Sequence, residues 1–182
     1  MKKNKMTKSE LNDHLKNCDW DSAATLDGKT KKVVWQQALA LCFRDSKDHR
    51  EGKLDDAVDA ATKAVASTDG ANEKITARCV RAYAYYLNGN YEQAIAECKR
   101  ISDFEQKEKK MDEIDTAFTQ AGRFVLELLA LVYGKLDEPL KANEFCRRLF
   151  AGQFTPSESE CFPVSPLVMD MYRESLKRMN RR

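Results

Sequence analysis

The sequence predicts an all-α fold, an antiparallel solenoid of helical hairpins, from three observations. Only four Pro and seven Gly interrupt its 182 residues. No stretch alternates apolar and polar residues over the length of a β-strand. A short turn pattern recurs along the chain, and internal repetition at a spacing of roughly 20–50 residues is typical of solenoids.

The clearest turn lies within Arg81–Ile101, RAYAYYLNGNYEQAIAECKRI. An aromatic-rich helix is expected to end just before Gly89, because glycine suits the left-handed residue that closes many helices. Asn90 can cap the next helix, and Gln93 completes a capping-box spacing. Ala94 then provides a small side chain where two antiparallel helices must approach closely.

This turn resembles that of the tetratricopeptide repeat. The family signature is a Gly, a polar residue, an aromatic, an acid and a small Ala, here Gly89, Asn90, Tyr91, Glu92 and Ala94. The run AIAEC that begins at Ala94 is similar to the second helix of such repeats in co-chaperones and adaptors. The resemblance implies a superhelix of stacked hairpins whose first helices line a concave groove. It also implies a non-catalytic adaptor or scaffold that binds a partner peptide or helix there.

Three further turns match the pattern in outline, at Cys18, Gly52 and Gly134. The spacings from 18 to 52, 52 to 89 and 89 to 134 are 34, 37 and 45. The first equals the family's unit length of about 34 residues. Two registers stay open for the last turn. One is the Gly134 alignment, and the other is shifted by three positions, so that Ala142–Leu149, ANEFCRRL, matches Ala94–Ile101, AIAECKRI.

The expected elements are four hairpins and a closing helix in one domain that spans residues 1–182. The hairpins lie at about 6–28, 32–68, 72–103 and 110–150, and the capping helix at 167–179. Their helices are expected at 6–17, 20–27, 32–51, 55–67, 73–88, 92–102, 112–133 and 137–150. Asn72 and Asp137 are candidate N-caps. The charged run 103–112 is expected to extend the following helix or to form an exposed loop.

The groove implied by the resemblance assigns eight candidate partner contacts. They are Phe43, His49, Thr76, Val80, Tyr83, Tyr86, Phe124 and Leu128. The alternative is that part of this stripe is ordinary core, covered by the C-terminal helix. Core is the default explanation of an apolar stripe at helical spacing.

Docking of the acidic C-terminal tail of a chaperone is disfavoured. Family members that bind such tails hold two carboxylates with Lys, Asn and Arg at fixed groove positions. Lys8 and Asn12 match the first pair, but the next three positions are Phe43, Thr76 and Val80. Starting one hairpin later gives no match. The groove is therefore expected to take an apolar or aromatic peptide.

The charge distribution favours a protein partner over a nucleic acid. The 31 basic and 29 acidic residues are interspersed, which is typical of solvated helix faces. Basic residues do gather at the two ends: Lys2, Lys3, Lys5 and Lys8, and Arg173, Lys177, Arg178, Arg181 and Arg182. A ribonucleoprotein component that contacts RNA through these ends is one alternative. Another is a dedicated chaperone for a secreted or assembled client, although such chaperones are typically acidic and this chain has a pI near 8.1.

Catalytic, metal and membrane roles have little support in the sequence. None of the six cysteines has C-x-x-C spacing, and only two His are present, so no metal or cofactor is expected. His14 and His49 lack a nucleophile-and-orienter arrangement, and the isolated glycines form no phosphate loop. No apolar run approaches the ~20 residues that span a bilayer. A non-enzymatic protein of a reducing, cytoplasmic compartment is expected, with its cysteines as small buried side chains.

Overall fold

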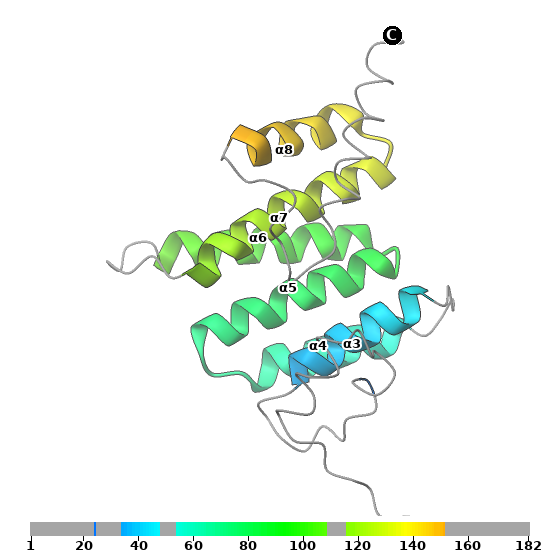
Figure 1. The fold of residues 1–182 in the computed structure, drawn as a ribbon, viewed down its shortest axis with the longest axis vertical. Helices are drawn as coiled ribbons and strands as arrows, with labels where there is room; N and C mark the ends of the chain where they lie inside the picture. Colours follow the sequence, from blue (N-terminus) through cyan, green and yellow to red (C-terminus); the bar gives the residue numbers. More distant parts are fainter. Residues whose placement is uncertain (1–23, 25–33, 48–53, 109–115, 152–182) are drawn as a thin grey trace, which may run out of the picture. The chain divides into compact units, whose positions relative to one another are not determined.

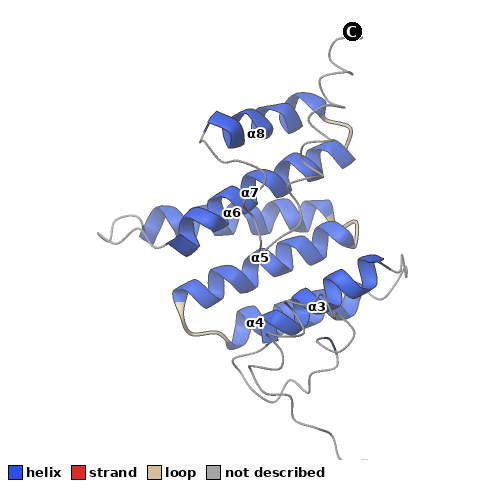
Figure 2. Ribbon diagram, in the orientation of Figure 1, coloured by secondary structure: helices blue, strands red, loops and turns tan. Residues whose placement is uncertain are grey.

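The described part of the chain is helical throughout. The structure is a computed structural model and describes residues 24, 34–47, 54–108 and 116–151. The helices are α3 (Val34–Lys47), α4 (Leu54–Ser67), α5 (Ala71–Leu87), α6 (Tyr91–Glu108), α7 (Thr116–Lys135) and α8 (Pro139–Ala151) (Figure 1). Figure 2 shows only helices and loops in these ranges, which confirms the predicted all-α class. The expected hairpin at 6–28, apart from Ala24, and the capping helix at 167–179 lie outside the described residues.

The chain divides into two compact units, Met1–Ala94 (unit 1) and Ile95–Arg182 (unit 2). Unit 1 holds α3, α4, α5 and the first turn of α6, and unit 2 holds the rest of α6 with α7 and α8. The expectation of one domain across the chain stays a prediction. Within the described residues, no helix is long and apolar enough to cross a membrane.

In unit 1, α3, α4 and α5 pack against one another through small side chains. The buried face of α4 consists of Ala57, Ala61, Ala64 and Val65. Alanines three and four positions apart form one stripe of a helix, and they let neighbouring axes approach closely. Trp35 of α3 packs against the cluster that Ala64 and Val65 form with Ala77 of α5.

The connection between α4 and α5 begins with a buried threonine. Thr68 Oγ1 donates a 2.6 Å hydrogen bond to the carbonyl of Ala64, one of those that a helix end leaves without an intrahelical partner. Gly70 occupies the N-cap of α5 in an extended conformation. The predicted N-cap, Asn72, is therefore wrong. Asn72 lies in the first turn, where its carbonyl accepts a 2.9 Å hydrogen bond from Thr76 Oγ1.

The turn between α5 and α6 closes as expected around Gly89. Its φ is +74°, in the left-handed region. The Gly89 N–H donates to the carbonyl of Tyr86 at 3.1 Å, and the Asn90 N–H donates to the carbonyl of Tyr85 at 2.8 Å. This pair of hydrogen bonds defines the Schellman motif, which satisfies two carbonyls at the end of α5.

The turn between α7 and α8 uses an aspartate in the left-handed position. Asp137 has φ +56°, and its N–H donates to the carbonyl of Gly134 at 3.4 Å. The Glu138 N–H donates to the carbonyl of Tyr133 at 2.9 Å. Alignment of the turn on Gly134 is therefore wrong, because α7 continues through that residue. Asp137 as N-cap is also wrong, because α8 begins at Pro139 and the cap position falls on Glu138.

The two turns repeat each other when Gly89 is aligned with Asp137. The hydrogen bonds that Asn88, Gly89, Asn90 and Ala94 donate recur at Leu136, Asp137, Glu138 and Ala142. The bond donated by the Tyr91 N–H has no counterpart, because Pro139 at the equivalent position lacks an N–H. The side chains that follow match in the same register and are buried in both helices: Ala94, Cys98 and Ile101 in α6, and Ala142, Cys146 and Leu149 in α8. Of the two registers left open by the sequence, the structure has the shifted one.

The charged run after Ser102 belongs to α6 as far as Glu108. The expectation that it extends the next helix or forms a loop is wrong for residues 103–108. No Gly or Pro lies between Tyr91 and Glu108, and Glu, Gln and Lys are good helix formers, so the preceding helix continues.

In unit 2, α7 and α8 pack as an antiparallel pair (Figure 1). The buried apolar residues of α7 are Ala121, Phe124, Val125, Leu128, Ala130, Leu131 and Val132. α8 contributes Ala142, Cys146 and Leu149 at helical spacing.

Replacing Gly89 by Ala should destabilise the protein by about 1–2 kcal/mol. No other atom lies within 4 Å of the position that a Cβ would take, so the cost comes from the left-handed backbone alone. Urea unfolding of Gly89→Ala and of wild type measures this loss of stability. Asp137→Gly is the matched control, since it relieves the same strain in the second turn and should not lower stability. Equal stability of Gly89→Ala and wild type would contradict the left-handed assignment.

Replacing Ala94 by Leu should cost about 1–3 kcal/mol, because the position is fully buried and additional methylenes overpack it. Ala96→Leu is the control on the same helix, since Ala96 is exposed and should change stability by less than about 0.5 kcal/mol. Thermal unfolding followed by circular dichroism compares the two. Similar melting temperatures for both variants would show that position 94 is not a close-approach site.

Candidate functional site

Four of the eight predicted partner contacts are buried. Val80 and Tyr83 are 0% and 5% exposed, and Phe124 and Leu128 are 3% and 0% exposed. Thr76 and Tyr86 are half-buried. His49 and the side chain of Phe43 lie outside the described residues. Partner binding by these residues stays a prediction, and Tyr86 is the large described side chain among them that keeps an accessible surface.

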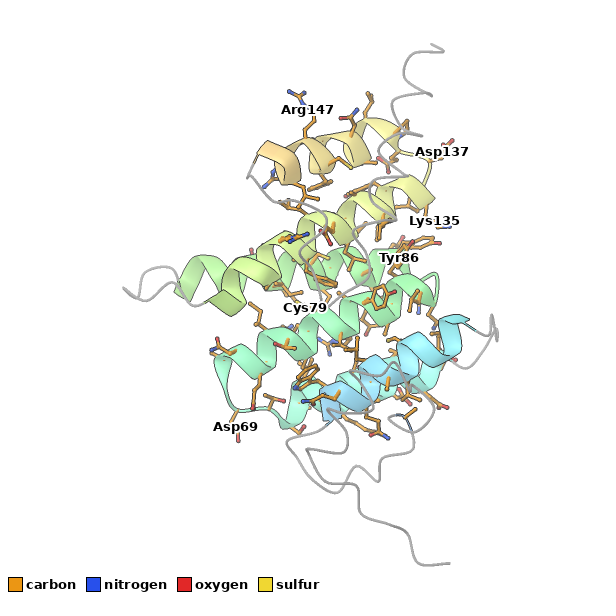
Figure 3. All side chains as sticks on the ribbon, in the orientation of Figure 1. Asp69, Cys79, Tyr86, Lys135, Asp137 and Arg147 are labelled. Atoms are coloured by element: carbon orange, nitrogen blue, oxygen red, sulfur yellow. The ribbon has the colours of Figure 1, made fainter. Side chains whose placement is uncertain are left out.

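A row of three tyrosines ends at the turn between α5 and α6. The ring centroids of Tyr83 and Tyr86 lie 6.3 Å apart in a stacked arrangement, and those of Tyr86 and Tyr91 lie 6.2 Å apart and tilted. Tyr83 and Tyr86 are three positions apart and so share one face of α5. Tyr91 is the first residue of α6, and the turn brings it to the same row. The row runs from the buried Tyr83 to the half-buried Tyr86 and Tyr91. Figure 3 labels Tyr86 near the end of α5.

The phenols of Tyr83 and Tyr86 are neutral at physiological pH. Burial raises the pKa of Tyr83, and the neighbouring Cys42 and Tyr86 raise it further. Burial also raises the pKa of Tyr86, with a smaller contribution from Tyr91. Tyr86, which is half-buried, therefore offers a partner an aromatic face and an uncharged hydroxyl group. Such side chains combine an apolar body with a hydrogen-bonding tip.

A second aromatic pair links α7 to α8. The rings of Tyr133 and Phe145 are stacked, with centroids 5.6 Å apart and an interplanar angle of 3°. Lys141 Nζ lies 5.0 Å from the Tyr133 centroid, and Arg148 Cζ lies 5.7 Å from the Phe145 centroid. Lys141 also forms an ion pair with Glu138. Stacking and cation–π contacts together explain these two partly exposed rings.

Sequence reasoning missed this pair because it depends on the register of the last turn. Tyr133 and Phe145 lie at equal distances along the chain before and after Pro139, the first residue of α8. Only the shifted register places them opposite each other. The sequence similarity between Ala94–Ile101 and Ala142–Leu149 was the signal that could have predicted this pair.

Two buried carboxylates in unit 2 were also missed. Glu97 and Glu127 are 0% and 1% exposed. Glu127 Oε1 accepts a 3.0 Å hydrogen bond from Arg123 Nε, one turn earlier on α7, in an ion pair that is itself mostly buried. Glu97 Oε2 accepts one of 3.0 Å from Arg100 Nη1, whose side chain is largely exposed. The sequence did contain a signal, because Glu127 lies inside an apolar run and is therefore expected to be buried. A buried charge requires a partner.

The four described cysteines are buried and form no disulfide: Cys42, Cys79, Cys98 and Cys146. The expectation that Cys98 and Cys146 are small buried side chains is confirmed. Burial raises the pKa of both thiols, that of Cys146 to about 11, and the neighbouring Glu97 raises that of Cys98 further. Because the thiolate is the reactive form, these thiols are poor nucleophiles at neutral pH. Cys18 and Cys161 lie outside the described residues, as do the basic ends of the chain.

Comparison with protein-family models, with curated proteins and with solved structures found no match to this chain. A search of the described residues for groups of three or more potential metal ligands found none. The function is therefore inferred from the repeated turn, the tyrosine row and the residues around them.

Stability should fall as the pH rises from about 9 to 11. The thiol of Cys146 has a raised pKa of about 11 in the folded state against 9.0 ordinarily, so the unfolded chain loses its proton first. After a discount for solvent screening, that difference favours unfolding by on the order of 2 kcal/mol once both states are ionised. Urea unfolding of wild type and Cys146→Ala at several pH values measures the slope. In Cys146→Ala the slope of the unfolding free energy against pH should become less steep, by an amount that corresponds to roughly one proton. An unchanged slope would contradict the assigned burial of Cys146.

Proposed function

We propose that this protein is a non-catalytic adaptor or scaffold built of TPR-like helical hairpins, which binds a peptide or helix of a partner protein. The observation that carries the proposal is the recurrence of one turn, at Gly89 and again at Asp137, with equivalent hydrogen bonds and equivalent buried positions. Repeated hairpins of this kind bury their faces by stacking, and stacked repeats present extended surfaces for partners.

In this proposal the partner contacts the tyrosine row at Tyr86. Tyr83 lies beneath Tyr86 and is 5% exposed, so it supports the upper ring. Tyr91 supports it from the start of α6. An aromatic side chain fixed on two sides loses little conformational entropy when a partner covers its free surface, which is typical of residues that dominate binding energy. The neutral phenols favour an apolar or aromatic partner side chain.

The other residues of the predicted groove have a supporting role in this proposal. Val80 and Tyr83 of unit 1 are buried, as are Phe124 and Leu128 of unit 2. The reduced state of the four buried cysteines fits a cytoplasmic location, where thiols stay free.

Replacing Tyr86 by Ala should weaken partner binding at least fivefold while the protein stays folded. The loss is expected because the half-buried ring supplies both contact area and a hydrogen-bonding tip. The measurement is a pull-down with the full chain, quantified by mass spectrometry, followed by calorimetric titration of the partner that is identified. Tyr86→Phe keeps the ring and should retain most of the affinity.

Tyr83→Ala is the matched control for core disruption. It should lower stability by about 3–5 kcal/mol, because it removes a large buried ring. A Tyr86→Ala variant that binds the same partners with unchanged affinity would contradict the proposed surface. A Tyr86→Ala variant that loses its cooperative unfolding would instead place Tyr86 in the core.

A further inference from the structure

The sequence places a glycine directly after an asparagine at one point, Asn88–Gly89. Asparagine is one of the thermally labile residues, and its side chain can be attacked by the backbone nitrogen of the residue that follows. Glycine leaves that nitrogen open to approach because it has no Cβ, and no other atom lies within 4 Å of the place that a Cβ would take at Gly89. Asn88 is therefore the asparagine expected to lose its side-chain amide most readily.

This loss, deamidation, requires water as its only co-reactant. The Gly89 nitrogen attacks Cγ of Asn88, the bond between Cγ and the amide nitrogen breaks, and the proton of Gly89 leaves with that nitrogen as ammonia. The product is a five-membered succinimide ring. Water then opens the ring at either carbonyl and leaves an aspartate or an isoaspartate. In both products a carboxylate replaces the uncharged amide.

The closed turn holds Asn88 away from the geometry of this reaction. Ring closure requires Asn88 Cβ and the Gly89 nitrogen to be nearly eclipsed about the Cα–C bond. The ψ of Asn88 is 5°, which instead eclipses the Gly89 nitrogen with the backbone nitrogen of Asn88 itself. Since the nitrogen and Cβ on a tetrahedral Cα lie about 120° apart in this view, the ring does not close in this conformation. The Gly89 N–H is also engaged, because it donates to the carbonyl of Tyr86 at 3.1 Å.

The Asn88 side chain is held by a residue of another helix. Its Nδ2 donates a 2.8 Å hydrogen bond to Oδ1 of Asp55, in the first turn of α4. The amide is the donor in this contact and the carboxylate is the acceptor. A carboxylate at position 88 has no proton to donate, and it would bring a second negative charge against Asp55. The contact therefore distinguishes the asparagine from its reaction products.

We propose that Asn88 is a deamidation site controlled by the turn between α5 and α6, and that Asp55 makes the change destabilising. The amide is protected while the turn is closed, and it reacts when the end of α5 opens locally. After the reaction, repulsion from Asp55 favours the open turn, so the modified turn closes less readily. This inference goes beyond the proposed adaptor function and depends on no partner.

The rate of deamidation in the full chain tests the protection. Wild type is incubated at one mildly alkaline pH, with and without guanidinium chloride, and peptide mapping by mass spectrometry follows Asn88. The rate should be about tenfold or more lower in the folded protein, because the turn must open first. Asn90, which Tyr91 follows, is the internal control and should react much more slowly than Asn88 in the denaturant. Equal rates at Asn88 in the folded and the unfolded chain would overturn the proposal.

Asp55→Ala tests the hydrogen bond within the folded protein. This variant should raise the rate at Asn88 by about threefold, because the amide loses its acceptor. Asp56→Ala is the matched control, since it removes a second exposed carboxylate from the same first turn of α4 and should leave the rate unchanged. Equal rates in the two variants would contradict control by Asp55.

Asn88→Asp reproduces the charge of the product without the reaction. It should lower the equilibrium constant for folding by roughly threefold to tenfold, because a hydrogen bond becomes a contact between like charges. Adding Asp55→Asn restores a donor opposite an acceptor and should recover most of this loss, whereas adding Asp56→Asn should not. Urea unfolding measures all of these variants. A loss that Asp55→Asn does not recover, or that Asp56→Asn recovers equally well, would show that Asp55 does not oppose the product.

Discussion

The same type of backbone hydrogen bond organises the turn at Gly89 and the turn at Asp137. The Asn90 N–H bonds to the carbonyl of Tyr85, and the Glu138 N–H bonds to that of Tyr133. Each bond closes a helix and reverses the chain, so the next helix begins one residue later. That bond requires a left-handed residue just before its donor. The position at which the chain adopts the left-handed conformation therefore determines which residues of the next helix are buried.

The fixed backbone separates the buried positions from the surface positions of each turn. Alanine, cysteine and an aliphatic residue recur at the buried positions after both turns. The surface positions differ, since Asn88 and Glu92 correspond to Leu136 and Leu140. The buried residues stabilise the fold, and the surface residues can vary and so can contact a partner. The same separation distinguishes the half-buried Tyr86 from the buried Tyr83 that supports it.

The sequence predicted the helices but misplaced several of their ends. Turn chemistry located the end of α5 closely, because few residues other than glycine adopt the left-handed conformation of Gly89. It failed at Gly134, because a glycine can also lie inside a helix. Pro139 is the better marker there: it restricts the residue before it, favours the first position of a helix, and so forces the turn to Asp137. Periodicity predicted an apolar stripe but could not tell a groove from a core, since both give the same spacing. The structure buries Val80 and Leu128 and leaves Tyr86 partly accessible.

The most direct test of the repeated turn is an NMR experiment on the labelled chain. The amides of Asn90 and Glu138 should both be protected from hydrogen exchange, because each donates the bond that closes its turn. Asp137 should show the strong contact between its amide and α protons that positive φ produces. Fast exchange at Glu138 combined with a weak contact between the amide and α protons of Asp137 would contradict the alignment of Asp137 with Gly89 and the account built on it.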